Sequence, residues 1–111
     1  MSDLSSKLCV PCESGMSPMS VIDVAKYSAE IPEWRTSIDF RKISREFKFK
    51  DFKEAMAFAN KVAETAETEG HHPDLHIFYD RVNIELQTHA LNGLSENDFI
   101  LAAKINTRYE P

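Results

Sequence analysis

The sequence lacks the features that mark several large classes of protein. None of its apolar runs approaches the ~20 residues that a membrane-spanning helix needs. No apolar block follows basic residues near the N-terminus, so we expect no secretory signal. Lysine and arginine form no cluster, and the formal net charge is −5. These absences disfavour a membrane partner and duplex nucleic acid, and leave a small molecule or a protein as the partner.

Glycine is also scarce, with three residues, while 42% of the 111 residues are hydrophobic and 28% are charged. This composition is typical of a globular protein. A chain of this length forms one domain that buries roughly 65% of the surface exposed by the unfolded chain.

The two cysteines, Cys9 and Cys12, form a Cys-x-x-Cys motif. A structural zinc site usually needs four ligands, so distant histidines would have to complete it. A thioredoxin-like redox motif would lie between a strand and a helix, and this pair does not. We interpret the pair as ordinary reduced thiols in a mobile N-terminal arm. Two thiols in a chain without a signal favour a cytoplasmic location.

Residues from Met1 to about Ser17 show no periodicity and are predicted to be an arm outside the core. We therefore divide the chain into an arm, 1–16, and a single domain, 17–111. Hydrophobic periodicity in the domain predicts the order helix, β-β, helix, β-β, helix. This order indicates a two-layer α+β fold, in which helices cover one face of a four-stranded antiparallel sheet. The predicted elements are a helix with Pro18 at its first position that stops before Pro32, strands over 34–40 and 42–49, a helix over 51–69, strands over 75–79 and 82–86, and a helix beginning at Ser95.

Two of these helices carry capping boxes. Asp51 and Glu54 open the second helix, and Ser95 and Asp98 open the last. Gly70 is placed to end the second helix in the left-handed conformation. The last helix is apolar on two sides, which favours a second covered surface and hence an oligomer.

Three of the four histidines lie within six residues, and the predicted hairpin returns the fourth to them. If the hairpin is centred near Asp80, paired residue numbers sum to about 160. His89 then lies opposite His71, with His72 one residue along, and opposite Cβ atoms are ~4.5–5.5 Å apart. Pro73 fixes the direction in which the chain leaves the His-His pair.

Three imidazoles allow three interpretations. They could bind zinc, although adjacent residues of an extended chain point to opposite sides. They could simply satisfy local hydrogen bonds. They could also catalyse proton transfer, because imidazole has a reference pKa of ~6.5. His76 falls within a strand pattern and is interpreted as a surface or packing residue.

At these residues the chain resembles the pterin-4a-carbinolamine dehydratase family. The family pattern is an acidic or polar residue, three residues, His-His-Pro, five residues, an aromatic, nine residues, a histidine, and then an aspartate. Further similarity lies in Trp34, in the run from Phe47 to Asn60, and in the run from Gly93 to Asp98. The segment from Cys9 to Glu13 is similar to bacterial-type members. The pattern is filled here by Glu67, His71-His72-Pro73, Tyr79, His89 and Asp98.

The resemblance implies dehydration of a 4a-hydroxytetrahydropterin to a quinonoid dihydropterin, which recycles the cofactor of aromatic amino-acid hydroxylases. It implies no metal and no cofactor, because the pterin is the substrate. His71 and His89 would be the acid and base. The implied substrate contacts are His72, Pro73, Glu67, Trp34 and Asp98.

Glu67 and Asp98 also have structural interpretations, as residues of a helix end and of a capping box. Trp34 likewise could be a packing residue. The resemblance further implies a homodimer or homotetramer, with an aromatic amino-acid hydroxylase as a partner. The alternative function is a non-catalytic binding or assembly module with the same fold that acts on a protein partner.

Overall fold

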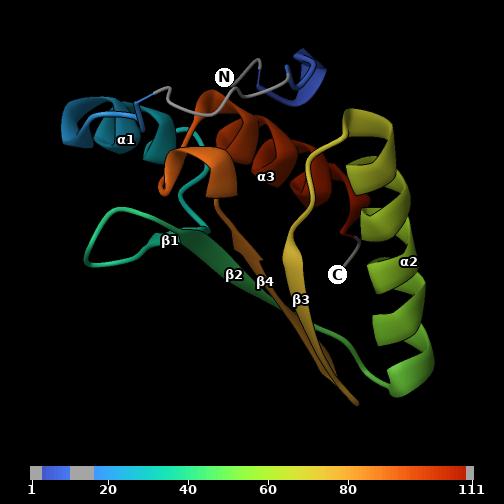
Figure 1. Cartoon of the computed structure of the whole chain (residues 1–111). Coiled ribbons are helices and arrows are strands. Elements are labelled where there is room, and N and C mark those ends of the chain that lie inside the picture. The colour runs from blue at the N-terminus through green and yellow to red at the C-terminus, as the bar shows by residue number, and fades with distance from the viewer. Residues whose placement is uncertain (1–3, 11–16, 110–111) are drawn as a thin grey trace.

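The computed structural model describes residues 4–10 and 17–109, and its elements follow the predicted order. Helices lie against one face of a single sheet, as Figure 1 shows, so the two-layer α+β prediction is confirmed. Within the described residues, no helix is both long and apolar enough to cross a membrane. The elements are η1 Leu4–Ser6, α1 Val21–Ser28, β1 Arg35–Thr36, β2 Ile43–Lys48, α2 Phe52–Glu69, β3 Asp74–Phe78, β4 Arg81–Leu86, η2 His89–Leu91 and α3 Glu96–Arg108.

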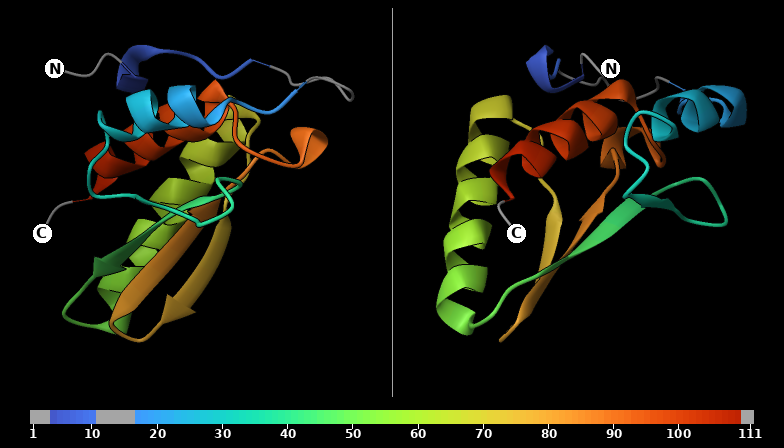
Figure 2. Two further views of the ribbon diagram at one scale, coloured as in Figure 1. Left: turned by 90° about the vertical axis from the view of Figure 1, so that its left-hand side faces the viewer. Right: turned by 180° about the vertical axis from the view of Figure 1, so that it is seen from behind.

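The four strands form one antiparallel sheet in the order β1-β2-β4-β3. On β4, Val82, Ile84 and Leu86 are fully buried, while the residues between them remain partly exposed. This alternation of period two points one face of the sheet at the helices and the other at solvent. The views in Figure 2 show α2 and α3 on the same side of the sheet.

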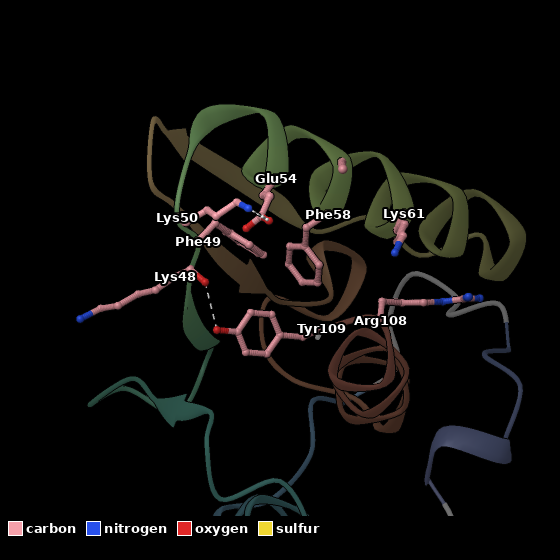
Figure 3. A pocket seen from close by; sticks show the side chains of 9 residues that line it. Lys48, Phe49, Lys50, Glu54, Phe58, Lys61, Arg108 and Tyr109 are labelled. Carbon is pink, nitrogen blue, oxygen red and sulfur yellow. Dashed lines mark hydrogen bonds and ion pairs between the residues drawn. The ribbon is translucent and has the colours of Figure 1, made fainter. Parts of the chain in front are cut away.

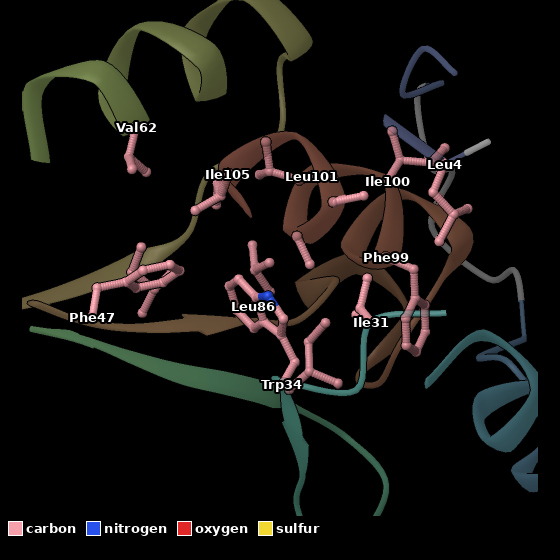
Figure 4. Close-up of a cluster of buried hydrophobic side chains, with 14 of the residues drawn as sticks. Leu4, Ile31, Trp34, Phe47, Val62, Leu86, Phe99, Ile100, Leu101 and Ile105 are labelled. Atoms are coloured by element: carbon pink, nitrogen blue, oxygen red, sulfur yellow. The ribbon is translucent and has the colours of Figure 1, made fainter. Parts of the chain in front are cut away.

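The core lies between this face and the two longer helices (Figure 4). Phe47 of β2 contacts Phe58 of α2, with ring centroids 4.7 Å apart. Phe58 is 3% exposed, whereas Phe52 at the first position of α2 is 53% exposed. The face of α2 that meets the core therefore includes Phe58 and leaves Phe52 outside.

The capping predictions hold in their main features. The Asp51 side chain accepts a hydrogen bond from the backbone N–H of Glu54 at 2.9 Å, while the Glu54 carboxylate pairs with Lys50 at 3.4 Å. At the other end, Gly70 has a φ of 66°, the left-handed conformation that ends α2. The Asp51 half of the predicted capping box and the predicted end of α2 are thus confirmed, whereas the Glu54 side chain turns to Lys50 and does not close the box.

The first predicted strand is much shorter than expected. Only Arg35 and Thr36 form β1, and Ile38, which was predicted to alternate into the core, is fully exposed. The side chain of Asp39 accepts a hydrogen bond from the Arg41 N–H at 3.1 Å, and Ser37 also bonds within this loop. Short polar side chains that bond to nearby backbone compete with strand pairing, so the chain turns where a strand was predicted.

The start of the first helix was also predicted wrongly. Ser20, not the residue before Pro18, is the N-cap of α1, and its hydroxyl accepts from the Asp23 N–H at 3.2 Å. Val24 is buried, whereas Ile22 is 75% exposed. The cap at Ser20 therefore determines which side of α1 faces the core.

The segment predicted as an arm outside the core contributes to the core at Leu4, which is 1% exposed. Leu4 packs in the cluster that includes Ile100 and Leu101 of α3. The second apolar side of α3 is therefore covered by its own chain. The apolar pattern of α3 thus gives no argument for an oligomer.

Candidate active site

The β3–β4 hairpin brings the histidines together, but in a different register from the predicted one. Asp74 pairs with Glu85 and Leu75 with Ile84, so paired numbers sum to 159 instead of 160. The ladder ends there, and His89 is not opposite His71. Thr88 instead bridges Gly93, and His89 begins η2.

His71 is held by a buried carboxylate. Its Nε2 lies 2.6 Å from Oδ1 of Asp98, whose side chain is completely buried. The other oxygen of Asp98, Oδ2, accepts from the Thr88 hydroxyl at 2.7 Å and from the Ser95 N–H at 3.0 Å. Asp98 also closes the predicted capping box of α3. Asp98 therefore has the structural role predicted for it, and it also contacts the candidate catalytic residue His71.

These contacts determine the tautomer of His71. The Thr88 hydroxyl and the Ser95 N–H both donate to Oδ2, and the Ser95 hydroxyl lies 2.7 Å from the Thr88 hydroxyl. These two donors occupy Oδ2, which leaves Oδ1 as the acceptor that faces His71. The Nε2 of His71 must then carry the proton donated to Asp98, which leaves Nδ1 as the nitrogen that can accept a proton.

His72 has a separate partner on the surface. Its Nε2 lies 2.6 Å from Oε2 of Glu67, and both side chains are mostly exposed. Glu67 therefore orients His72 from the last turns of α2. Because His71 turns to Asp98 and His72 to Glu67, the two adjacent imidazoles face different partners, as predicted for an extended chain.

The three histidines line one pocket of about 470 Å³. It opens where the end of α2, the start of β3 and the η2 segment approach one another. The residues that line it are Cys9, Val10, Glu69, Gly70, His71, His72, Gln87, Thr88, His89, Ala90 and Asn97. His89 and His72 are exposed, whereas only 12% of the His71 side chain is.

Several of these residues were missed from the sequence. Thr88 follows no motif that we used, although it adjoins His89, and Asn97 lies in the run from Gly93 to Asp98 but was not predicted to be a site residue. The N-terminal residues Cys9 and Val10 belong to the predicted arm. The backbone N–H of Cys9 donates to Oε1 of Glu69 at 2.8 Å, and this bond lowers the pKa of Glu69, with Lys104 acting in the same direction. Burial, followed by the charge of Glu69, raises the pKa of Cys9 to about 12.

Four predicted substrate contacts lie outside the residues that line the pocket, and one of them, Glu67, is connected to it through its pair with His72. Asp98 is buried behind His71 and acts on the pocket through that imidazole. Pro73 follows the His-His pair and directs the chain into β3. Trp34 is 4% exposed, its Nε1 donates to Oδ1 of Asn106 at 2.8 Å, and its ring packs edge-on against Phe47.

The sequence left open that the histidines or the cysteines bind a zinc ion, and the positions of these side chains bear on that interpretation. Among residues 4–10 and 17–109, no group of three or more His, Cys, Asp or Glu side chains is arranged to hold a metal ion. Cys12 lies outside the described residues, so the structure describes only Cys9 of the two predicted thiols.

A larger pocket of about 610 Å³ lies at the opposite end of α2 (Figure 3). Its floor is made of Phe49, Phe58 and Tyr109, and Lys61 and Arg108 stand beside it. No histidine lines this pocket. His71, His72 and His89, which were predicted to form the site, all line the smaller pocket instead.

Comparison with known proteins identifies the family. Residues 17–108 match the family model described as pterin 4 alpha carbinolamine dehydratase. A relative from Halorhodospira halophila, named "putative pterin-4-alpha-carbinolamine dehydratase", is 46% identical over 93% of this chain and 94% of its own. A relative of the same name from Rickettsia canadensis is 45% identical over 97% and 99%. The chain belongs to the pterin-4a-carbinolamine dehydratase family.

Solved structures agree with this fold. The crystal structure of a transcriptional coactivator/pterin dehydratase from Brucella melitensis has a TM-score of 0.78 and 33% identity, over 83% of this chain and 98% of its own. A pterin dehydratase-like protein identified as a RuBisCO assembly factor in the alpha-carboxysome has a TM-score of 0.60 and 25% identity, over 68% and 88%.

Proposed function

We propose that the protein dehydrates a 4a-hydroxytetrahydropterin to a quinonoid dihydropterin and water. The observation that carries the proposal is the buried Asp98–His71 pair, set in one pocket with His72 and His89. Membership of the dehydratase family supports the substrate class.

The reaction needs two proton transfers and no change of oxidation state. The C4a–O bond breaks, the hydroxyl leaves with an added proton as water, and loss of the N5 proton lets a C4a=N5 double bond form. Positioned acids and bases typically accelerate such steps by 10²–10⁴-fold each. Groups that gain and lose protons near neutrality are therefore what the site must supply.

His71 is suited to be the base. Its Nε2–H is directed at Asp98, so Nδ1 can accept the N5 proton. The imidazolium formed in this step would stand 2.6 Å from the buried carboxylate, which stabilises its positive charge. Asp98 is in this proposal a positioning residue, because it acts through His71.

His89 is the proposed acid that protonates the departing hydroxyl. It lines the same pocket and is exposed, so it can recover its proton from water. His72, oriented by Glu67, is the proposed substrate contact. We assign Trp34 and Pro73 to packing and to chain direction within one subunit.

Single alanine variants of the four histidines test these roles. We expect His71→Ala and His89→Ala to lower kcat for loss of chemically generated carbinolamine, each by about 10²-fold or more. His72→Ala should mainly raise KM. His76→Ala is the matched control, because His76 is exposed on β3 and outside the pocket. A His71→Ala variant as active as the control would refute the proposal.

The cellular role follows from the chemistry. Quinonoid dihydropterin is the species reduced to regenerate a tetrahydropterin, so we propose cofactor recycling for an aromatic amino-acid hydroxylase in the cytoplasm. A homodimer or homotetramer is the proposed assembly. Light scattering on the purified protein decides the assembly, and a single-subunit mass would overturn it. In a reconstituted hydroxylase reaction, adding this protein should stop carbinolamine from accumulating, and unchanged accumulation would argue against recycling.

The second candidate function is a binding module that assists assembly of another protein. The observation that favours it is the structural similarity to the pterin dehydratase-like RuBisCO assembly factor. This function predicts a complex, recovered by affinity purification, that survives the double change His71→Ala and His89→Ala. Loss of the complex in that variant, or recovery of none, would count against the module.

A further inference from the structure

The N-terminal segment 4–10 is attached to the helices that carry the histidine pocket. Leu4 is buried in the core, and the Ser5 carbonyl accepts a hydrogen bond from Nζ of Lys104 at 3.1 Å. Lys7 pairs with Glu96 at 3.2 Å. The segment is therefore held at several points along its length.

Its last two described residues reach the pocket itself. The Cys9 N–H bonds to Glu69, two residues before His71. The Val10 N–H donates to Oδ1 of Asn97 at 3.0 Å, and Nδ2 of Asn97 donates back to the Val10 carbonyl at 2.5 Å. This pair of bonds fixes the Val10 backbone beside the start of α3, where Asp98 also lies.

Val10 presents an apolar side chain at the edge of a polar pocket. It lines the pocket with the three histidines and is 64% exposed. An apolar side chain fixed at the edge of a pocket can gain stability when a bound ring covers it. The segment lies outside residues 17–108, which match the family model.

We propose that Val10 contacts the bound pterin and is a specificity-determining residue of the histidine pocket. This proposal rests on the proposed function for the identity of the ligand. Val10 takes no part in proton transfer, so its contribution is to binding.

The test replaces the valine with an isosteric polar residue in the full-length protein. Val10→Thr keeps the shape of the side chain and replaces one methyl group with a hydroxyl. The matched control is Leu8→Thr, because Leu8 lies on the same segment, is 73% exposed and is not among the pocket's lining residues. Val10→Ile should preserve the contact. Melting temperatures of all variants should match the wild type, since both positions are exposed.

Two readouts distinguish this proposal from the proposed function. We expect Val10→Thr to raise KM for the carbinolamine, and the Kd for 7,8-dihydrobiopterin measured by fluorescence, about fourfold, as for the loss of one methyl contact. The value of kcat should not change, and Leu8→Thr and Val10→Ile should behave as the wild type. Equal KM and Kd in Val10→Thr and Leu8→Thr would overturn the proposal. A wild type that binds the dihydropterin in a Val10-dependent way but dehydrates nothing would refute the enzyme and retain the contact.

Discussion

Replacing Asp98 with asparagine should inactivate the enzyme by changing the tautomer of His71. Oδ2 of Asp98 accepts two hydrogen bonds, from the Thr88 hydroxyl and the Ser95 N–H. An asparagine has a single side-chain oxygen, which those two donors will retain. Its NH₂ group must then face His71, and two donors cannot share that bond. The proton of neutral His71 would move to Nδ1, the nitrogen proposed to act as base.

The expected size of the effect follows from the lost function. Asp98→Asn should lower kcat about 10²–10⁴-fold, the usual contribution of a positioned acid or base. It should also lower the free energy of unfolding by about 1–3 kcal/mol, because a hydrogen bond to a charged group becomes a neutral one. The fold should survive, since the capping bonds to the side-chain oxygen are kept.

The assay combines carbinolamine loss in a stopped-flow instrument with ¹⁵N NMR of the His71 imidazole. The wild type should show a protonated Nε2 and the variant a protonated Nδ1. Thr88→Val is the matched control, because it removes one donor to Asp98 but keeps the carboxylate that faces His71. If Thr88→Val loses as much kcat as Asp98→Asn, or if the tautomer is the same in both, the reasoning is wrong.

Three further predictions concern the end of α2. Contacts with the N-terminal segment lower the pKa of Glu69, so Glu69 stabilises the fold at neutral pH, and this contribution is lost as the pH falls below the ordinary value of ~4.3. In urea titrations, Glu69→Gln should lower the free energy of unfolding more at pH 7 than at pH 3; an equal loss at both would contradict this. Gly70→Ala should cost about 1 kcal/mol from its φ of 66°, since nothing lies within 4 Å of the added Cβ, and thermal unfolding that showed no loss would argue against that strain. Glu67→Gln should change stability by less than ~1 kcal/mol, because its pair with His72 is exposed, while KM rises; an unchanged KM would remove Glu67 from the site.

The sequence predicted the fold well where local signals and periodicity agreed. The cap at Asp51 and the left-handed Gly70 each leave a local chemical signature, and both lie where predicted. β4 has a strict alternation and was placed correctly. The loop around Ile38 has the same alternation, but its side-chain hydrogen bonds outweigh strand pairing.

The sequence predicted which histidines belong to the site better than it predicted how they are arranged. His71, His72 and His89 do line one pocket, yet the hairpin differs by one residue from the predicted register, and η2 replaces the expected strand end. Asp98 meets His71 because α3 packs under the hairpin, and no local pattern shows such a contact. The place of the N-terminal segment at the pocket depends on bonds between residues 60 to 87 positions apart. Such contacts arise from tertiary packing.

The most direct test of the account is the rate of carbinolamine loss with wild-type protein and with the His71→Ala/His89→Ala double variant at equal concentration. The account predicts a wild-type rate at least about 10²-fold above that of the double variant. Equal rates would contradict it, because the pocket histidines would then transfer no protons in this reaction.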